Sequence, residues 1–227
     1  TRLVTNALLI TDVSAAGIVN AGLDSIVISL DGIDQEVYSF YRIGGQLSKV
    51  IEAVKLIVEE KNKQKKSLPS IYLQFIIMRH NEHQIEAVRD LAKELKVDHL
   101  IFKRICDLNG FPSDLSVLEK FLPSNPAYRA YKVEEGAIRW NTGKPDINFC
   151  PMAWNYPAVN WDGSLFPCCF DYGNLDMGNV FEDSFKKVWN NRSFLRLRRE
   201  ISAGKKDLPV CGNCPINIYD DIIKEIS

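Results

Sequence analysis

The chain of 227 residues carries 28 basic and 29 acidic side chains, so its formal net charge is −1. This balance gives no electrostatic reason to expect a nucleic-acid partner or an anionic membrane surface. No apolar run approaches the roughly 18–20 residues that span a bilayer, and the first residues lack the basic-then-apolar plan of a signal peptide. Nucleic-acid and membrane partners are therefore not expected.

The first hundred residues alternate strand and helix patterns. Strands are predicted at residues 3–5, 25–30, 71–78 and 99–102, and helices at 10–21, 47–58 and 85–95. One apolar stripe with i, i+3, i+4, i+7 spacing marks the long central helix: Leu47, Val50, Ile51, Val54, Ile57 and Val58. Strands joined by helical crossovers form parallel sheets, and their continuous apolar runs indicate burial on both faces. The fold class is therefore α/β.

The pattern changes twice after residue 106. Residues 107–149 are punctuated by four prolines and are predicted to be a linker with short helices. In residues 150–227, Asp162-Gly163 between two short apolar runs is a strong hairpin signal. A helix is expected to carry Phe185, Val188 and Trp189 on one side. This C-terminal domain is small enough that a metal is expected to supplement its core.

Five of the six cysteines lie in the last third of the chain, and Cys106 stands alone before them. A secreted disulfide scaffold would be shorter and would carry a signal peptide, so reduced thiolates that bind metal in the cytoplasm are the better interpretation. The candidate ligands are Cys150, one of the two neighbours Cys168 and Cys169, Cys211 and Cys214. Their spacing favours an iron–sulfur cluster over zinc or unliganded core cysteines, all three remaining open. Cys168 and Cys169 are neighbours, so one is expected to be a ligand and the other to pack among apolar residues.

The cysteine pattern resembles the SPASM/twitch domain of radical S-adenosylmethionine (radical SAM) enzymes. The resemblance lies in Cys-x12-Gly-x4-Cys from Cys150 to Cys168, Gly178-Asn179-Val180, Trp189 and the closing Cys-x2-Cys-Pro. It assigns Cys168 rather than Cys169 as ligand. The further cysteines of a second auxiliary cluster are missing, so it implies one 4Fe–4S cluster held by Cys150, Cys168, Cys211 and Cys214.

The N-terminal half resembles part of the radical SAM (β/α) barrel, a TIM-barrel relative. Val4-Thr5-Asn6 is similar to its "TNG" strand end, residues 26–32 to the next strand, and residues 41–45 to the following loop. The resemblance implies that Thr5, Asn6, Ser29 and Asp31 line the S-adenosylmethionine pocket at the carboxyl ends of the strands. The expected domains are a partial barrel of about four βα units over 1–106, the 107–149 linker, and a cysteine-rich α+β SPASM-like domain over 150–227.

The family's Cys-x3-Cys-x2-Cys motif, which binds the radical-generating cluster, is absent from these residues. We therefore expect the barrel to be truncated at its N-terminus and this fragment alone to be inactive. The alternative is a degenerate relative that has lost radical chemistry.

The resemblance implies an oxidoreductase or maturase that generates a 5′-deoxyadenosyl radical for hydrogen abstraction. It implies S-adenosylmethionine and a 4Fe–4S cluster as cofactors, a small-molecule, sugar or peptide substrate, and an electron donor such as a flavodoxin or ferredoxin. The alternative is a non-enzymatic four-cysteine module that binds zinc or a cluster structurally. Arg42 is expected to be a solvated loop residue, with binding of a carboxylate as the alternative. Structural roles are expected for the three histidines (His80, His83, His99) and for the core tryptophans Trp154, Trp161 and Trp189.

Overall fold

The computed structural model describes residues 1–105, 119–134, 137–140, 150, 152–169, 171, 175–204, 208 and 211. These residues fall into two compact units. Of the described residues, the first unit holds those up to residue 140 and the second those from residue 150 onward. Cys106 and Cys214 lie outside the described residues, as do the parts of the predicted linker at 107–118 and 141–149.

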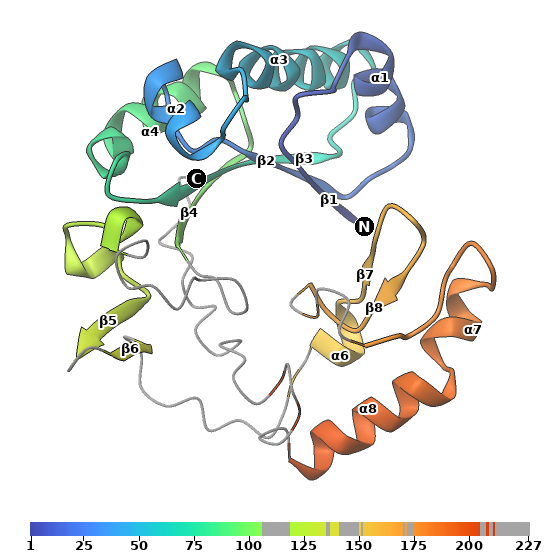
Figure 1. Cartoon of the computed structure of the whole chain (residues 1–227). Helices are drawn as coiled ribbons and strands as arrows, with labels where there is room; N and C mark the ends of the chain where they lie inside the picture. Colours follow the sequence, from blue (N-terminus) through green and yellow to red (C-terminus); the bar gives the residue numbers. More distant parts are fainter. Residues whose placement is uncertain are drawn as a thin grey trace. The chain divides into compact units, whose positions relative to one another are not determined.

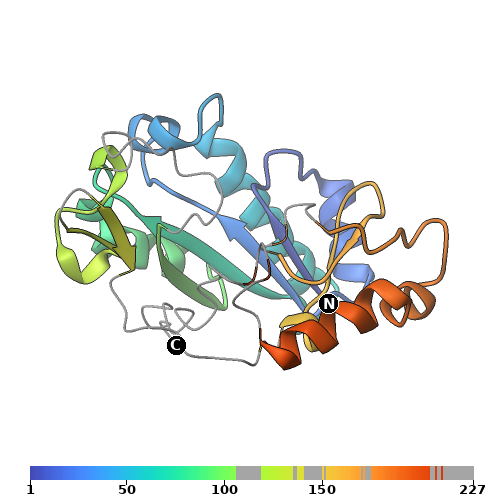
Figure 2. The same ribbon diagram turned by 60° about the horizontal axis from the view of Figure 1, so that its bottom comes forward.

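The first unit is built on a four-stranded parallel sheet in the order β1-β2-β3-β4. The strands are β1 (Arg2–Thr5), β2 (Ser25–Ser29), β3 (Ser70–Ile77) and β4 (His99–Arg104). The sheet curves, and its helices follow the outer, convex side (Figure 1). Figure 2 shows the same strands from a second direction. The predicted α/β class with a parallel sheet is confirmed, and the curvature agrees with part of a barrel.

Four helices cover the convex face: α1 (Asp12–Asn20), α2 (Gln35–Tyr41), α3 (Leu47–Lys63) and α4 (Ile85–Glu94). α3 buries the predicted stripe, with Val50, Val54 and Ile57 fully inaccessible. They pack with alternate strand residues, including Ile28, Leu73 and Phe102, in one apolar cluster. Because side chains alternate along a strand, the intervening residues, such as Val27 and Ser29, face the concave side.

Two elements of this unit differ from the prediction. α2 was not predicted. Only one of its residues, Tyr38, is buried, so no apolar stripe marks the helix in the sequence. β5 (Tyr131–Glu134) and β6 (Ala137–Trp140) form an antiparallel hairpin within the stretch predicted as a linker with short helices. Short helical turns are also present in this stretch, at residues 119–121 and in the 3-10 helix η2 (Pro126–Tyr128).

The second unit is small. The predicted Asp162-Gly163 hairpin is present as β7 (Ala158–Val159) and β8 (Leu165–Phe166), with shorter strands than expected. The expected helix occurs as α7 (Phe185–Trp189), and a second helix, α8 (Arg192–Ala203), follows after a break at Asn190 and Asn191. α6 (Met152–Asn155) completes the helices described here.

The core of this second unit gathers residues from most of its elements. Its buried members are Cys150, Ala153, Leu165, Met177, Val188, Phe194, Leu197 and Ile201. Trp154 and Trp189 pack against them, whereas Trp161 is 86% exposed at the hairpin. The core role expected for Trp161 is therefore wrong, because the turn carries its side chain out to solvent.

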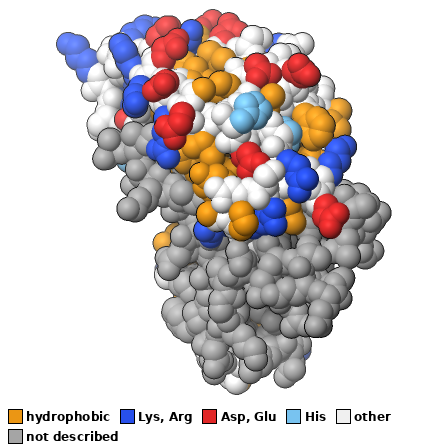
Figure 3. Space-filling model, turned by 90° about the vertical axis from the view of Figure 1, so that its left-hand side faces the viewer, with side chains coloured by type: hydrophobic (Ala, Val, Ile, Leu, Met, Phe, Trp, Pro, Cys, Tyr) orange, Lys and Arg blue, Asp and Glu red, His pale blue; other side chains and the backbone are white. Residues whose placement is uncertain are grey.

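Among the described helices, none is both long and apolar enough to cross a membrane. Figure 3 shows the face of the first unit on the α2 and α4 side, where basic and acidic side chains are interspersed with scattered apolar ones. α4 illustrates the mixture, with Glu86–Arg89 and Asp90–Lys93 ion pairs one turn apart.

Candidate functional site

The carboxyl ends of the parallel strands are where a sheet of this class places its ligands. Ser29 is the last residue of β2, and its register partner on β3 is Gln74. Both are buried, at 7% and 8% exposure, and both alternate with helix-facing residues, so their side chains share the concave face. The structure thus places a hydroxyl and an amide side by side at this strand end. A polar residue inside the apolar run 71–78 was the signal that could have singled out Gln74.

Thr5 and Asn6 follow the end of β1, but both side chains make local contacts. Thr5 pairs in register with the core residue Ile28, so it lies on the helix side of the sheet. Its hydroxyl accepts a hydrogen bond from the Ala7 backbone N–H at 3.0 Å, and Asn6 Oδ1 accepts from Leu8 N–H at 3.2 Å. These bonds shape the turn after β1, so the cofactor contacts expected of Thr5 and Asn6 stay predictions.

Asp31 lies two residues beyond β2 and is fully buried. Its Oδ2 accepts from Arg42 Nε at 2.6 Å, and its Oδ1 accepts from the Ile76 backbone N–H at 2.9 Å. Burial raises the pKa of Asp31 above its ordinary value, while the Arg42 guanidinium and the Ile76 N–H oppose that rise. Both carboxylate oxygens therefore have partners within the protein, and the expected contact of Asp31 with a cofactor stays a prediction.

Arg42 has a more specific role than the solvated loop position expected from the sequence. Arg42 lies in the loop after α2, and its guanidinium forms an ion pair with Asp31. The arginine side chain is only 26% exposed. Asn81 adds a further link, because its amide donates to the backbone carbonyls of Asp31 and Ile76. The ends of β2 and β3 and the loop at residues 42–46 are thereby tied together.

His80 lies at the same edge. Its ring packs against Phe40 in a tilted arrangement with centroids 4.5 Å apart, and burial lowers its pKa, which favours the neutral imidazole. His99 stacks on Tyr72 at 4.3 Å at the opposite end of the strands. Both contacts agree with the structural roles expected for these histidines.

Four of the cysteines lie among the described residues. Cys150 is buried, Cys168 and Cys211 are half-buried, and Cys169 is exposed. Cys150 and Cys211, far apart in the sequence, belong to the same apolar cluster. The apolar surroundings expected for Cys169 are wrong, because the turn after β8 leaves that residue at the surface.

No three His, Cys, Asp or Glu residues among those described are close enough together to hold a metal ion, and Cys214 lies outside them. The convergence of four sulfurs therefore stays a prediction. The donor chemistry nevertheless fits an iron–sulfur cluster, because reduced thiols are its usual ligands and Cys150 is only 7% exposed among apolar residues.

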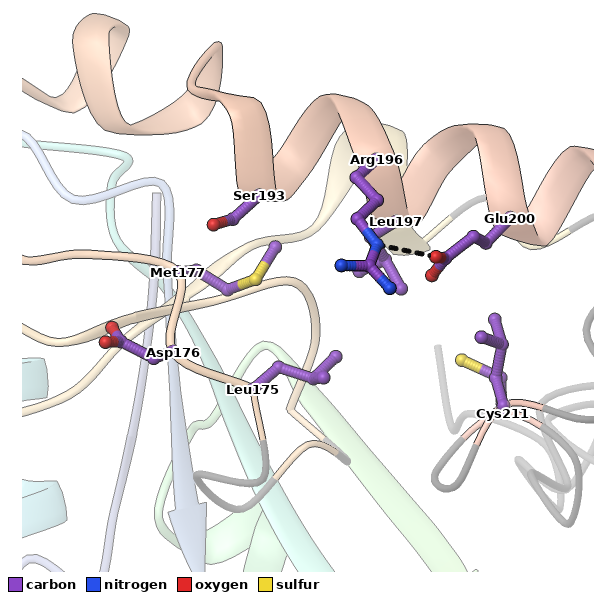
Figure 4. Close-up of a pocket in the computed structure, with 9 residues that line it drawn as sticks. Leu175, Asp176, Met177, Ser193, Arg196, Leu197, Glu200 and Cys211 are labelled. Carbon is purple, nitrogen blue, oxygen red and sulfur yellow. Dashed lines mark hydrogen bonds and ion pairs between the residues drawn. The ribbon is translucent and has the colours of Figure 1, made fainter.

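A pocket of about 380 Å³ lies beside Cys211. Figure 4 shows Arg196 and Glu200 projecting from α8 on one side of it and the Cys211 sulfur on the other. Arg196 Nε and Glu200 Oε1 form an ion pair at 2.7 Å. The other lining residues are Leu175, Asp176, Met177, Ser193, Leu197 and Leu208. The pocket is thus an apolar hollow with a charged rim, next to one predicted cluster ligand.

Comparison with known proteins identifies the second unit. The family model described as SPASM, an iron–sulfur cluster-binding domain, matches residues 150–215, the segment that holds the four candidate ligands. These residues are thus similar to the SPASM domain. The match confirms the predicted class of metal cofactor for this domain.

The whole chain resembles solved radical SAM structures. Streptococcus suis SuiB bound to S-adenosylmethionine aligns with a TM-score of 0.58 and 16% identity, covering 97% of this chain and 56% of SuiB. The enzyme anSMEcpe with bound AdoMet aligns with a TM-score of 0.51 and 15% identity, covering 88% of this chain and 57% of that one. The predicted radical SAM fold followed by a SPASM domain is confirmed.

One curated relative is similar in sequence. A "Probable GTP 3',8-cyclase" of Methanococcus maripaludis is 25% identical over 194 residues, which cover 78% of this chain and 61% of the relative. The chain therefore spans about three fifths of the length of the curated relative that it matches.

Proposed function

We propose that this chain belongs to a radical SAM maturase or oxidoreductase of the cytoplasm, with one auxiliary 4Fe–4S cluster in its SPASM-like domain. The observation that carries the proposal is the SPASM match over the cysteine pattern of residues 150–215, on a chain whose fold is that of radical SAM enzymes. The proposed domain bounds are the partial barrel at 1–106, the linker at 107–149 and the cluster domain at 150–227.

In this proposal Ser29 and Gln74 bind S-adenosylmethionine from the concave face. Thr5, Asn6 and Asp31, at or just beyond the carboxyl ends of β1 and β2, are further candidates. When bound beside a reducing cluster, this cofactor supplies a 5′-deoxyadenosyl radical that takes a hydrogen atom from the substrate. The chain's own residues position the cofactor and exclude water. The Asp31–Arg42 ion pair holds the loop at residues 42–46 against the ends of β2 and β3.

Cys150, Cys168, Cys211 and Cys214 are the proposed ligands of the auxiliary cluster. The shared apolar surroundings of Cys150 and Cys211 support this assignment, because they limit solvent access to a bound cluster.

We propose a peptide substrate first. SuiB has been solved with its precursor peptide SuiA, and anSMEcpe with a Cp18Cys peptide, at TM-scores of 0.55 and 0.51. A nucleotide is the second candidate, favoured by the similarity to the probable GTP cyclase. Incubation of the full-length protein with S-adenosylmethionine, reductant and either candidate, followed by mass spectrometry, distinguishes the two. Product from GTP but from no peptide would contradict the first choice.

The metal separates this proposal from a non-enzymatic zinc module. After anaerobic purification, a broad absorbance near 400 nm and bound iron are expected. A colourless protein with stoichiometric zinc would overturn the iron–sulfur proposal.

These 227 residues lack the Cys-x3-Cys-x2-Cys motif, so we expect no cleavage of S-adenosylmethionine by this chain alone. Chromatographic detection of 5′-deoxyadenosine, formed by the chain with reductant, would contradict this expectation.

A further inference from the structure

α7 and α8 carry an excess of basic side chains. Residues 185–203 contain six basic residues and one acidic residue, Glu200, although the whole chain is nearly neutral. Arg192, Arg196 and Arg199 are exposed and spaced at i, i+4 and i+7, so they form one stripe along α8. This set is called the arginine stripe below.

The arginine stripe lies opposite the buried side of its helix. Phe194, Leu197 and Ile201 are 0%, 5% and 1% exposed, and at 100° per residue they face away from the stripe. Arg198, by contrast, lies 4.2 Å over the Trp189 ring and donates to the backbone carbonyls of Ala153 and Trp189. The chain thus uses one arginine of α8 for its own packing and presents three to solvent.

The arginine stripe adjoins the pocket that contains Cys211. Arg196 belongs to both, since it lines the pocket and stands between Arg192 and Arg199 on the helix surface. Figure 4 shows Arg196 and Glu200 facing the pocket from α8, with the Cys211 sulfur directed toward it. Three exposed arginines, of which Arg196 pairs with Glu200, therefore lie next to a proposed cluster ligand.

We propose that the arginine stripe is the docking surface of an acidic one-electron carrier protein that exchanges electrons with the SPASM cluster. This inference rests on the proposed function, because it needs a cluster bound through Cys211. The carrier gives up one electron, the cluster gains it, and no covalent bond is made or broken. Charge complementarity suits such short-lived complexes, because it speeds encounter and fixes orientation without requiring tight binding.

Binding tests the surface independently of enzyme activity. The probe is an oxidised, acidic plant-type [2Fe–2S] ferredoxin, titrated calorimetrically into the cluster-loaded chain at low salt. The double substitution Arg192→Glu/Arg199→Glu should raise the Kd at least tenfold, and Arg192→Gln/Arg199→Gln should raise it less. Among the described residues, neither Arg192 nor Arg199 makes a side-chain hydrogen bond or ion pair that the substitutions would remove. Circular dichroism checks that the variants fold.

The matched control is Lys49→Glu/Lys55→Glu, which changes the same amount of charge at two exposed positions of α3. It should alter the Kd less than twofold. Raising the salt to about 0.5 M should abolish the difference between the variants, because exposed charges are then screened within a few ångströms. If Arg192→Glu/Arg199→Glu and the control Lys49→Glu/Lys55→Glu weaken binding equally, the proposal is overturned. A short DNA duplex that binds the stripe in preference to ferredoxin would also overturn it.

Electron transfer gives the second readout. Absorbance near 400 nm, recorded before mixing, must be the same in wild type and variants, and a small-molecule reductant must bleach it equally. Stopped-flow reduction by reduced ferredoxin should be at least tenfold slower in the Arg192→Glu/Arg199→Glu variant alone. Absence of iron in every variant would contradict the proposed function, whereas intact clusters reduced at equal rates would contradict the docking surface.

Discussion

The cores of the two units differ in size and in composition. The first buries a continuous apolar layer between a parallel sheet and its helices, and its largest inaccessible side chains include Phe75 and Phe102. The second has a small core in which two of the proposed metal ligands, Cys150 and Cys211, take part. We therefore expect burial alone to stabilise the first unit, and the folding of the second to depend on a bound cluster.

The largest effect is expected from removing a proposed ligand. Cys150→Ala or Cys211→Ala should lower the iron content from about four atoms per chain to nearly none, because each sulfur closes the cluster site. The second unit should then unfold, since metal-binding energy there is folding energy. Iron analysis and near-ultraviolet circular dichroism measure both. Cys169→Ala is the matched control and should retain iron; if Cys169→Ala loses it and Cys168→Ala does not, the ligand assignment is reversed.

The stability of the first unit should depend on its apolar core and not on bound iron. Phe75→Ala removes a fully buried ring and should lower the free energy of unfolding of this unit by about 3–5 kcal/mol. Urea titration followed by far-ultraviolet circular dichroism measures the loss with and without iron. A loss that changes by more than about 1 kcal/mol on iron removal would show that the two units do not fold independently.

A third prediction concerns the ion pair of the first unit. Arg42→Ala leaves the Asp31 carboxylate buried without its cation and should cost about 3–5 kcal/mol near pH 8. Burial already raises the pKa of Asp31, and loss of Arg42 raises it further. As the pH falls through that raised value, Asp31 takes up a proton in the folded state and its buried charge disappears. The stability gap to wild type should therefore shrink toward acid pH.

The double variant Asp31→Asn/Arg42→Ala is the control for this pH effect. Without the carboxyl group, its stability difference from Asp31→Asn alone should be nearly independent of pH between 4 and 8. Thermal unfolding at a series of pH values measures these differences. A gap that widens as the pH falls would mean that Asp31 is not the titrating group.

The smallest effect is expected at the strand ends. Ser29→Ala in the full-length enzyme should weaken S-adenosylmethionine binding by about 0.5–1.5 kcal/mol, the net contribution of one hydrogen bond. Ser25→Ala is a matched control, because Ser25 lies on the same strand and face but at the opposite end of β2. In the wild type the Ser25 hydroxyl accepts a hydrogen bond from Arg2 Nε. Calorimetry should detect weaker binding for Ser29→Ala only. Equal affinities would return Ser29 to a structural role.

The sequence was sufficient for the elements that bury long apolar patterns. The stripe of α3 and the apolar run of β2 lie where periodicity places them, because both patterns follow directly from the geometry of one element. α2 was missed because it buries little besides Tyr38, and the β5–β6 hairpin was missed because the prolines around it suggested irregular structure.

The candidate site was harder to predict because its contacts join distant segments. Asp31 pairs with Arg42 in a loop and with the backbone of β3, and nothing in the local pattern reveals either partner. The partnership of Ser29 with Gln74 likewise depends on register between strands. The cysteine pattern was predictive because ligand spacing is itself a local signal.

The hairpin of the second unit is fastened to a later segment of the chain. Leu165 N–H donates to the Gly178 carbonyl at 2.9 Å, Val180 N–H donates to the Gly163 carbonyl at 2.8 Å, and Asn179 Nδ2 donates to the Asp162 carbonyl at 2.8 Å. Gly163 has φ +83°, and a Cβ there would meet Asn179 Oδ1 and the Phe181 ring, so this junction admits only glycine without rearrangement. These bonds close a loop that contains Cys168. Closing this loop restricts the positions that the Cys168 thiol can sample before any metal binds. Part of the conformational entropy that the ligands would lose on binding a metal is therefore already lost when the unit folds.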